Sequence, residues 1–185
     1  MLPDAQSASE GNKRCAPEGN DKNNMQTIWA PWRIEYLTKE REDGCIFCEK
    51  PKEKKDRRNL ILYRGETGFI IMNRYPYSNG HLMAVPYRHI RELTQLNQKE
   101  RLELINLTIR CVEILKGFKT EGFNIGMNIG KAAGAGIDDH IHFHVVPRWS
   151  GDTNFMPVIG NIKVIPEYLD QSYSKLTQQI KTTKR

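Results

Sequence analysis

Short apolar runs in the first half of the sequence are separated by polar punctuation. Residues 60–63, 69–73 and 81–85 are rich in aliphatic and aromatic side chains, and Gly, Pro or Asn residues bound the runs. Runs of this length and composition are typical of β-strands. The segment between the last two runs, NRYPYSNG at residues 73–80, predicts a hairpin-type connection.

The middle of the chain has helical spacing. Apolar residues recur there at intervals of three and four positions, namely Leu102, Ile105, Ile109 and Val112. This spacing predicts an amphipathic helix from residue 97 to about residue 117, and Asn97 with Glu100 forms a capping-box pattern at its start. A second helix is predicted over residues 166–183, with Pro166 at its first position.

Two more strands are predicted after the long helix. Apolar side chains alternate at Phe123, Ile125, Met127 and Ile129, and residues 140–146 form a further strand pattern. The order strand, hairpin, long helix, strand, strand is not the strict alternation of a doubly wound fold. The sequence therefore predicts an α+β fold, with an antiparallel sheet of about five strands, one long packed helix and a C-terminal helix.

The composition fits one globular domain with polar flanking segments. The chain has 185 residues, of which 38% are hydrophobic, and this suits a single core without disulfides. Residues 1–24 hold few apolar side chains, so we expect a disordered N-terminal tail. Residues 25–157 are assigned to the domain and residues 158–185 to a C-terminal extension that contains the last helix.

Charge, cysteines and hydropathy limit the class of protein. A net charge of +6 suits a polyanionic ligand, although an ordinary basic surface explains it more simply. The four cysteines, Cys15, Cys45, Cys48 and Cys111, are too sparse for a disulfide scaffold. No apolar run approaches the roughly 18 residues of a membrane span, and the N-terminus lacks the apolar run of a secretory signal. We therefore expect a cytoplasmic protein without a membrane partner.

Three of the five histidines lie within five residues. His140, His142 and His144 alternate with Ile141 and Phe143, and on a strand this alternation places the three imidazoles on one face. Neutral imidazole is a nucleophile and a metal ligand, and protonated imidazole is a cation suited to phosphate oxygens. The pattern predicts metal binding or phosphoryl chemistry; the alternative is a half-exposed strand that happens to be rich in histidine.

A loop of small residues, GKAAGAG at residues 130–136, directly precedes these histidines. Small residues let backbone N–H groups approach phosphate oxygens closely. It is not a Walker loop, because it lacks the Gly-Lys-Ser/Thr ending. Alone, such a loop is more often a simple turn, but its place before the three histidines makes it a candidate for oxyanion binding.

The segment from His140 to Val146 resembles the His-φ-His-φ-His-φ-φ signature of the histidine-triad superfamily. The segment IIMNRYPYSNGHLMAVP resembles the nucleotide-binding strand of the branch with the fragile-histidine-triad hydrolases. The early WAPWR and the segment GMNIGKAAGAGIDDHIHFHVVPRWSGDTNFMP resemble diadenosine tetraphosphate phosphorylase-like members of microbes. The resemblance covers about residues 29–157 and implies the histidine-triad version of the α+β fold.

This resemblance implies roles for three histidines. His142 would be the nucleophile that forms a covalent nucleotidyl-histidine. His144 would contact the same phosphate and help the leaving group depart. His81 would lie beside the triad as a supporting catalytic residue, and a purely structural role is the alternative.

The resemblance also implies a nucleotide site. Asn73 would bind the ribose hydroxyls, with Ile71 and Met83 against the base. The residues expected at the phosphates are Asn128, Lys131, Gly134, Ala135, Gly136 and Ile137. Many relatives carry Ser, Thr or Gln just before the triad, whereas this chain has Ala-Gly-Ile, so backbone amides must substitute for those side chains.

The remaining histidines and a C-x-x-C pair imply a metal. Zinc-binding members of the superfamily combine such a pair with a histidine after a P-x-x-H turn and the first triad histidine. The matching residues here are Cys45, Cys48, His89 and His140, a set that suits structural zinc. The alternative is a metal-free pair of reduced cysteines that pack as small apolar residues.

The resemblance implies a homodimer in which helices and sheets of two copies meet. The implied reaction is nucleotidyl transfer from a dinucleoside polyphosphate such as diadenosine tetraphosphate, with phosphate or water as acceptor. One alternative is a nucleoside phosphoramidate hydrolase, and another is a nucleotide-sensing or nucleic-acid-associated binding module. The presence of all three triad imidazoles favours catalysis over binding alone, and a nucleic-acid partner is not expected.

Overall fold

A computed structural model describes residues 44–152 and 165–183 of the chain. The predicted tail, residues 25–43 and 153–157 of the predicted domain and part of the C-terminal extension lie outside these residues. Within the described residues, no helix is both long enough and apolar enough to cross a membrane. The expected cytoplasmic location stays a prediction.

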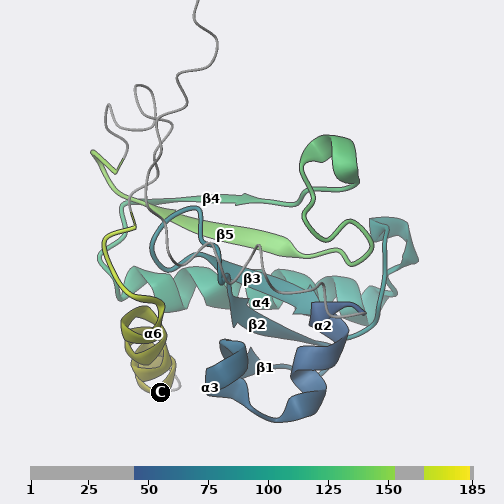
Figure 1. Ribbon diagram of the computed structural model, residues 1–185, viewed down its shortest axis with the longest axis horizontal. Helices are drawn as coiled ribbons and strands as arrows, with labels where there is room; N and C mark the ends of the chain where they lie inside the picture. Colours follow the sequence, from purple (N-terminus) through teal and green to yellow (C-terminus); the bar gives the residue numbers. More distant parts are fainter. Residues whose placement is uncertain (1–43, 153–164, 184–185) are drawn as a thin grey trace, which may run out of the picture. The chain divides into compact units, whose positions relative to one another are not determined.

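One antiparallel sheet of five strands forms the centre of the fold (Figure 1). Its order is β1-β2-β3-β5-β4, and antiparallel partners neighbour each other throughout. The strands are β1 (Ile61–Arg64), β2 (Gly68–Met72), β3 (Leu82–Pro86), β4 (Gly122–Gly126) and β5 (Phe143–Arg148). The predicted α+β class and the strand number are confirmed.

Helices and helical turns surround this sheet. The short ones are α2 (Ile46–Glu49), η2 (Lys50–Glu53), α3 (Asp56–Asn59), η3 (Leu93–Gln95) and η4 (Lys131–Ala133). The long ones are α4 (Gln98–Lys116) and α6 (Leu169–Thr183).

The last two strands differ from their predicted bounds. Strand β5 begins at Phe143 rather than at residue 140, because the backbone N–H of Ile141 donates to the carbonyl of Ile90, outside the sheet ladder. Strand β4 ends at Gly126, opposite His144, rather than at residue 129.

Helix α4 starts as predicted. The side chain of Asn97 accepts from the backbone N–H of Glu100 at 2.9 Å, and the Glu100 carboxylate accepts from the backbone N–H of Asn97 at 2.9 Å. This reciprocal capping box satisfies two of the donors that a helix start leaves open. Glu100 also pairs with Arg88, which holds the pKa of its carboxyl at about 2.

The face that α4 buries is not the apolar stripe identified in the sequence. Leu102, Ile105 and Ile109 are 64%, 49% and 52% exposed. The apolar residues that α4 buries against the sheet are Leu104, Leu107, Cys111, Ile114 and Leu115. The helix is apolar on two sides, so spacing alone could not indicate which stripe meets the sheet.

Gly68 shows which face of the sheet meets α4. A Cβ atom at this position would lie 2.9 Å from Leu107 Cδ1 and 2.6 Å from the carbonyl oxygen of Val85. Side chains alternate along a strand, so Ile70 also points toward α4, whereas Ile71 points to the opposite face. That opposite face is the one on which the histidines lie.

Helix α6 begins later than predicted. The backbone N–H groups of Gln171 and Ser172 both donate to the carbonyl of Tyr168, so the first helical residue is Leu169 and Pro166 precedes the helix. Three buried side chains, Tyr173, Leu176 and Ile180, form one stripe of this helix within the core. The Tyr173 hydroxyl donates to the carbonyl of Ile61 at 2.9 Å, which ties α6 to β1.

Candidate functional site

A row of side chains crosses the sheet on the face away from α4. Ile71 of β2 is paired with Met83 of β3, and Met83 with His144 of β5. Directly opposite residues in antiparallel strands share one face. The two predicted base contacts therefore lie on the same face as the last triad histidine.

The three triad imidazoles follow one another along this face. The ring of Phe47 in α2 lies 5.4 Å from the ring of His140 and 4.9 Å from the ring of His142. The rings of His142 and His144 are 4.7 Å apart, edge to face. Ile141, which alternates with them, is buried. The predicted alternation holds, although the first two histidines precede the strand.

The backbone determines which nitrogen of His142 carries the proton. Its Nδ1 lies 2.9 Å from the carbonyl oxygen of His140. A carbonyl only accepts, so Nδ1 carries the proton and Nε2 holds a lone pair. Burial lowers the pKa of His142, which keeps the ring neutral at neutral pH. His142 therefore has the protonation state of a nucleophile.

His144 has the opposite arrangement, and His81 is the reason. The backbone N–H of Tyr77 donates to Nδ1 of His81 at 3.1 Å. An amide N–H can only donate, so the His81 proton is on Nε2, which lies 2.9 Å from Nδ1 of His144. His144 Nδ1 accepts the hydrogen bond from this N–H, so the proton of the neutral His144 ring is on Nε2.

The two neighbouring imidazoles thus have different chemical capacities. His142 offers a lone pair at Nε2, whereas His144 offers an N–H donor at Nε2. Burial, followed by the neighbouring His142, lowers the pKa of His144 to about 4, so His144 donates as a neutral ring. His81 is fully buried and its ring contacts His144, so it holds the orientation of the His144 ring.

Asn73 lies beside this relay. Its Nδ2 is 3.3 Å from Nδ1 of His81, and its Oδ1 accepts the backbone N–H of Tyr75 at 2.9 Å. The structure therefore brings Asn73 next to His81, and its contact with the ribose hydroxyls stays a prediction. Sequence reasoning missed the contribution of Tyr77, because a backbone N–H leaves no trace in residue type.

The glycine-rich loop is folded back on itself. Gly130 and Gly134 have φ angles of +79° and +83°, a region that favours glycine. The N–H of Gly134 donates to the carbonyl of Lys131 at 2.9 Å, and that of Ala135 donates to the carbonyl of Gly130 at 3.4 Å. Two of the four amides expected at the phosphates are therefore engaged within the loop.

The other residues predicted to contact the phosphates differ in their hydrogen bonds and exposure. Within residues 44–152 and 165–183, no protein group accepts a hydrogen bond from the amides of Gly136 and Ile137. The Lys131 side chain is 86% exposed and its ammonium lies 4.0 Å from the Asp138 carboxylate. Asn128 lies in the segment between β4 and the loop. The amides of Gly136 and Ile137 thus differ from those of Gly134 and Ala135, which are engaged within the loop.

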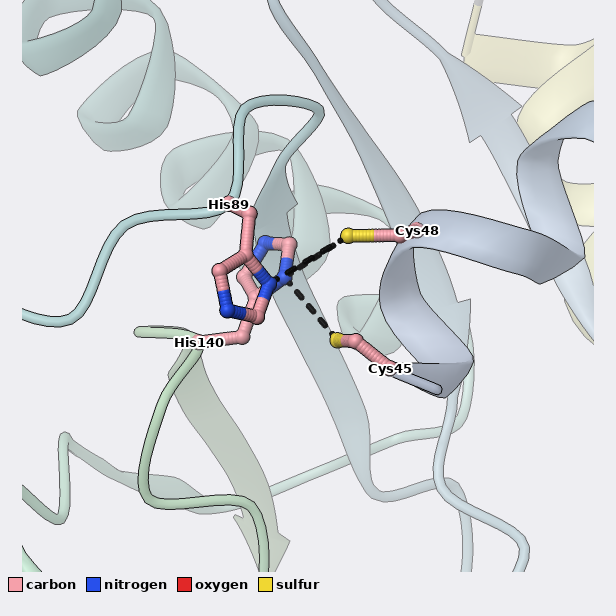
Figure 2. A group of neighbouring side chains, drawn as sticks. All are labelled: Cys45, Cys48, His89 and His140. Carbon is pink, nitrogen blue, oxygen red and sulfur yellow. Dashed lines mark hydrogen bonds between the residues drawn. The ribbon is translucent and has the colours of Figure 1, made fainter. Parts of the chain in front are cut away.

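Two cysteines and two histidines converge at the other end of the triad (Figure 2). One potential ligand atom from each of Cys45, Cys48, His89 and His140 lies within 4.8 Å of the others. Cys45 Sγ is 3.2 Å from His140 Nδ1, and Cys48 Sγ is 3.4 Å from His89 Nδ1. The cysteine pair at the start of α2 therefore meets one histidine after β3 and one before β5.

The donor chemistry of this cluster fits zinc. His140 Nε2 lies 2.9 Å from the carbonyl of Pro86 and carries the proton, so the lone pair of Nδ1 faces the sulfurs. His89 Nε2 lies 3.6 Å from the Asp139 carboxylate, which favours the same tautomer. Burial, followed by Cys45, raises the pKa of Cys48 to about 11. A divalent cation would displace the thiol protons and complete a tetrahedral Cys₂His₂ site.

Comparison with known proteins is consistent with this site. Residues 54–151 match the HIT domain. The chain belongs to the HIT domain family. It is 39% identical to the AP-4-A phosphorylase of Mycobacterium tuberculosis (strain ATCC 25618 / H37Rv), over 80% of each chain. The HIT domain match leaves out α2 and α6, so the cysteine pair and the C-terminal helix lie outside the matched residues.

Two solved structures share the fold. A zinc-bound histidine triad family protein from Mycobacterium smegmatis has a TM-score of 0.62 and 26% identity, over 76% of this chain and 95% of that one. A hypothetical histidine triad nucleotide-binding protein from Sulfolobus tokodaii has a TM-score of 0.58 and 26% identity, over 75% of this chain and 91% of that one.

Proposed function

We propose that this HIT protein transfers a nucleotidyl group from a dinucleoside polyphosphate of the diadenosine tetraphosphate type. The observation that carries the proposal is the tautomer of His142, whose Nε2 lone pair is set by the carbonyl of His140. The name of the M. tuberculosis relative, AP-4-A phosphorylase, supports this substrate and favours phosphate as the acceptor.

The reaction proceeds in two displacements. The Nε2 lone pair of His142 bonds to the α-phosphorus, and the P–O bond to the leaving polyphosphate breaks with its electron pair on that oxygen. The Nε2–H of His144 donates to a phosphate oxygen and stabilises the negative charge that develops. An oxygen of inorganic phosphate or of water then bonds to phosphorus, and the N–P bond breaks to return the lone pair to His142; an attacking water releases one proton to the solvent.

The nucleotide would lie across the histidine face of the sheet. We assign the base to Ile71 and Met83, which share this face with His144, and the ribose hydroxyls to Asn73, whose amide can donate and accept. The amides of Gly136 and Ile137 would hold phosphate oxygens, with Asn128 and Lys131 nearby on the loop. Gly134 and Ala135 would contribute amides only if the turn that now engages them opens.

An assay with and without phosphate tests the proposed function. Diadenosine tetraphosphate incubated with the protein and inorganic phosphate is expected to yield ATP and ADP, and without phosphate no ADP. Release of AMP and ATP in water would keep the nucleotidyl transfer but assign water as the acceptor. Turnover of adenosine phosphoramidate alone, or nucleotide binding without any turnover, would overturn the proposal in favour of an amidase or a sensing module.

We also propose that the Cys45, Cys48, His89 and His140 cluster holds a structural zinc ion. All four positions of a tetrahedral site would be occupied by protein ligands, which is typical of structural rather than catalytic zinc. The ion would tie α2 to the segment that carries His142. The experiment is given in the Discussion.

A homodimer is the third part of the proposal. The exposed stripe of Leu102, Ile105 and Ile109 on α4 supports it, because contiguous exposed apolar residues on a helix mark contact surfaces. Strand β4 lies at an edge of the sheet and exposes Ile125. We assign both surfaces to a second copy of this chain, as the histidine-triad resemblance implies.

Substituting one residue of the stripe tests the dimer. Ile109→Asp is expected to halve the molar mass measured by light scattering, because it places a charge in the apolar contact. Leu93→Asp is the matched control: Leu93 is 42% exposed but lies outside α4, and this variant is expected to remain dimeric. A dimeric Ile109→Asp protein would remove α4 from the interface.

A further inference from the structure

Helix α6 makes a polar contact with the loop that precedes His81. The amide Nδ2 of Asn79 donates to the Glu167 carboxylate at 3.1 Å. The Ser172 hydroxyl lies 2.8 Å from Oδ1 of Asn79 and 2.6 Å from Glu167 Oε2, and its single proton serves one of them at a time. Lys175 pairs with the same carboxylate.

This contact is buried rather than superficial. Ser172 is 1% exposed, and the Glu167 side chain is 12% exposed. Burial alone would raise the pKa of Glu167, yet hydrogen bonds from Lys175, Ser172 and Asn79 lower it. Buried polar groups are costly unless they are satisfied, so the network favours one geometry of Asn79 over others.

The geometry of Asn79 is transmitted to His81 over two residues. Gly80 lies between them and has a φ angle of +75°. A Cβ atom at this position would lie 3.2 Å from Leu115 Cδ2. The N–H of His81 donates to the carbonyl of Ser78 at 3.1 Å. The backbone from Ser78 to His81 is thus a tight turn, so a displacement of Asn79 would also displace the His81 ring.

We propose that α6 is a positioning element of the active site, in which Ser172 and Glu167 hold Asn79 so that His81 orients His144. The donor that faces Nδ1 of His81 is the N–H of Tyr77, which belongs to the same loop. A loop released from α6 would lose this donor, and His81 could then no longer enforce the Nε2–H form of His144. The expected change in kcat rests on the proposed function, whereas the expected change in the ring tautomers does not.

The cysteine pair contacts the triad from its other end. The C-x-x-C pair of the N-terminal flank contacts His140, whose carbonyl sets His142. The C-terminal flank contacts Asn79, which leads to His81 and His144. Each flanking segment outside the HIT domain match therefore contacts a residue that leads to one of the two reacting imidazoles.

The test compares hydroxyl removals on one helix. Ser172→Ala removes the contact with Asn79, whereas Ser174→Ala removes an exposed hydroxyl that donates to the Asp170 carbonyl. Tyr173→Phe serves as a control for stability, since it loses the bond to Ile61 on the side of α6 that faces β1. Ring nitrogen chemical shifts of His81 and His144 in the ligand-free protein report the tautomers directly.

Ser172→Ala is expected to convert the single tautomer of His144 into a mixture and to lower kcat by about tenfold or more, with KM changed far less, because misplacement of reacting groups affects turnover first. Glu167→Ala, which lies outside the helix, is expected to do the same should Ser172→Ala fail to fold. Ser174→Ala and Tyr173→Phe are expected to retain the wild-type ring shifts.

Unchanged ring shifts and kcat in both Ser172→Ala and Glu167→Ala would overturn the proposal and leave α6 as a purely structural helix. The wild-type protein could instead show no turnover of dinucleotides while the ring shifts still change in Ser172→Ala and Glu167→Ala. That result would contradict the proposed function, and the positioning role of α6 would stand.

Discussion

Replacement of His142 by alanine is expected to lower the turnover of diadenosine tetraphosphate by at least about a thousandfold, because the covalent route is lost with its nucleophile. The Nε2 lone pair of His142 is the one that the His140 carbonyl leaves available. Its neighbour cannot substitute, since the corresponding nitrogen of His144 carries a proton in the relay from His81. Binding of AMP is expected to change only a few-fold.

Trapping the intermediate separates this role from a structural one. Wild-type protein quenched with alkali during turnover of substrate labelled at the α-phosphate is expected to retain the label as a phosphoramidate, which acid then releases. His142→Ala is expected to retain none. His144→Ala, which keeps the nucleophile but loses the N–H donor, is expected to retain label and to turn over more slowly. Near-normal turnover of His142→Ala would exclude this residue from the mechanism.

Removal of zinc is expected to have the largest effect on stability. A structural zinc site contributes several kcal/mol of folding free energy, which corresponds to a fall in melting temperature on the order of 10 °C for a domain of this size. The loss arises because the ion joins α2 to segments near His89 and His140, 41 and 92 residues beyond Cys48. A strong chelator and the Cys45→Ser variant are both expected to show this fall.

A third cysteine provides the matched control. Cys111 is fully buried in α4 and lies outside the cluster, so Cys111→Ala is expected to lose packing energy but to retain one zinc per chain. Metal analysis of both variants, purified without added zinc, shows whether Cys45→Ser loses the metal that Cys111→Ala retains. Substoichiometric metal in the wild type, together with an unchanged melting temperature for Cys45→Ser, would contradict the proposed site.

Local features of this chain could be predicted from residue order alone. The Asn97 and Glu100 capping box, the long helix and the alternation of histidines with Ile141 depend on spacings of a few residues, and these spacings are read directly along the chain. The fold class followed from the order of such elements. The four cluster residues were also predicted, because zinc-binding members of the histidine-triad superfamily combine such a C-x-x-C pair with two histidines at matching positions.

The tertiary structure decided which of several local possibilities is used. Helix α4 carries two apolar stripes, and only packing on the sheet selected the one with Leu107 over the one with Ile109. The start of β5 at Phe143 depended on a hydrogen bond from Ile141 to Ile90, and the late start of α6 on the carbonyl of Tyr168.

The proton positions of the imidazoles also required the folded chain. His81 and His144 are 63 residues apart, and Ser172 and Asn79 are 93 residues apart. A ring nitrogen becomes a donor or an acceptor according to the group that faces it, and those groups are backbone N–H and carbonyl groups that every residue type carries. The triad histidines could therefore be predicted from the sequence, whereas the different proton positions of His142 and His144 arise only once distant backbone groups lie against their rings.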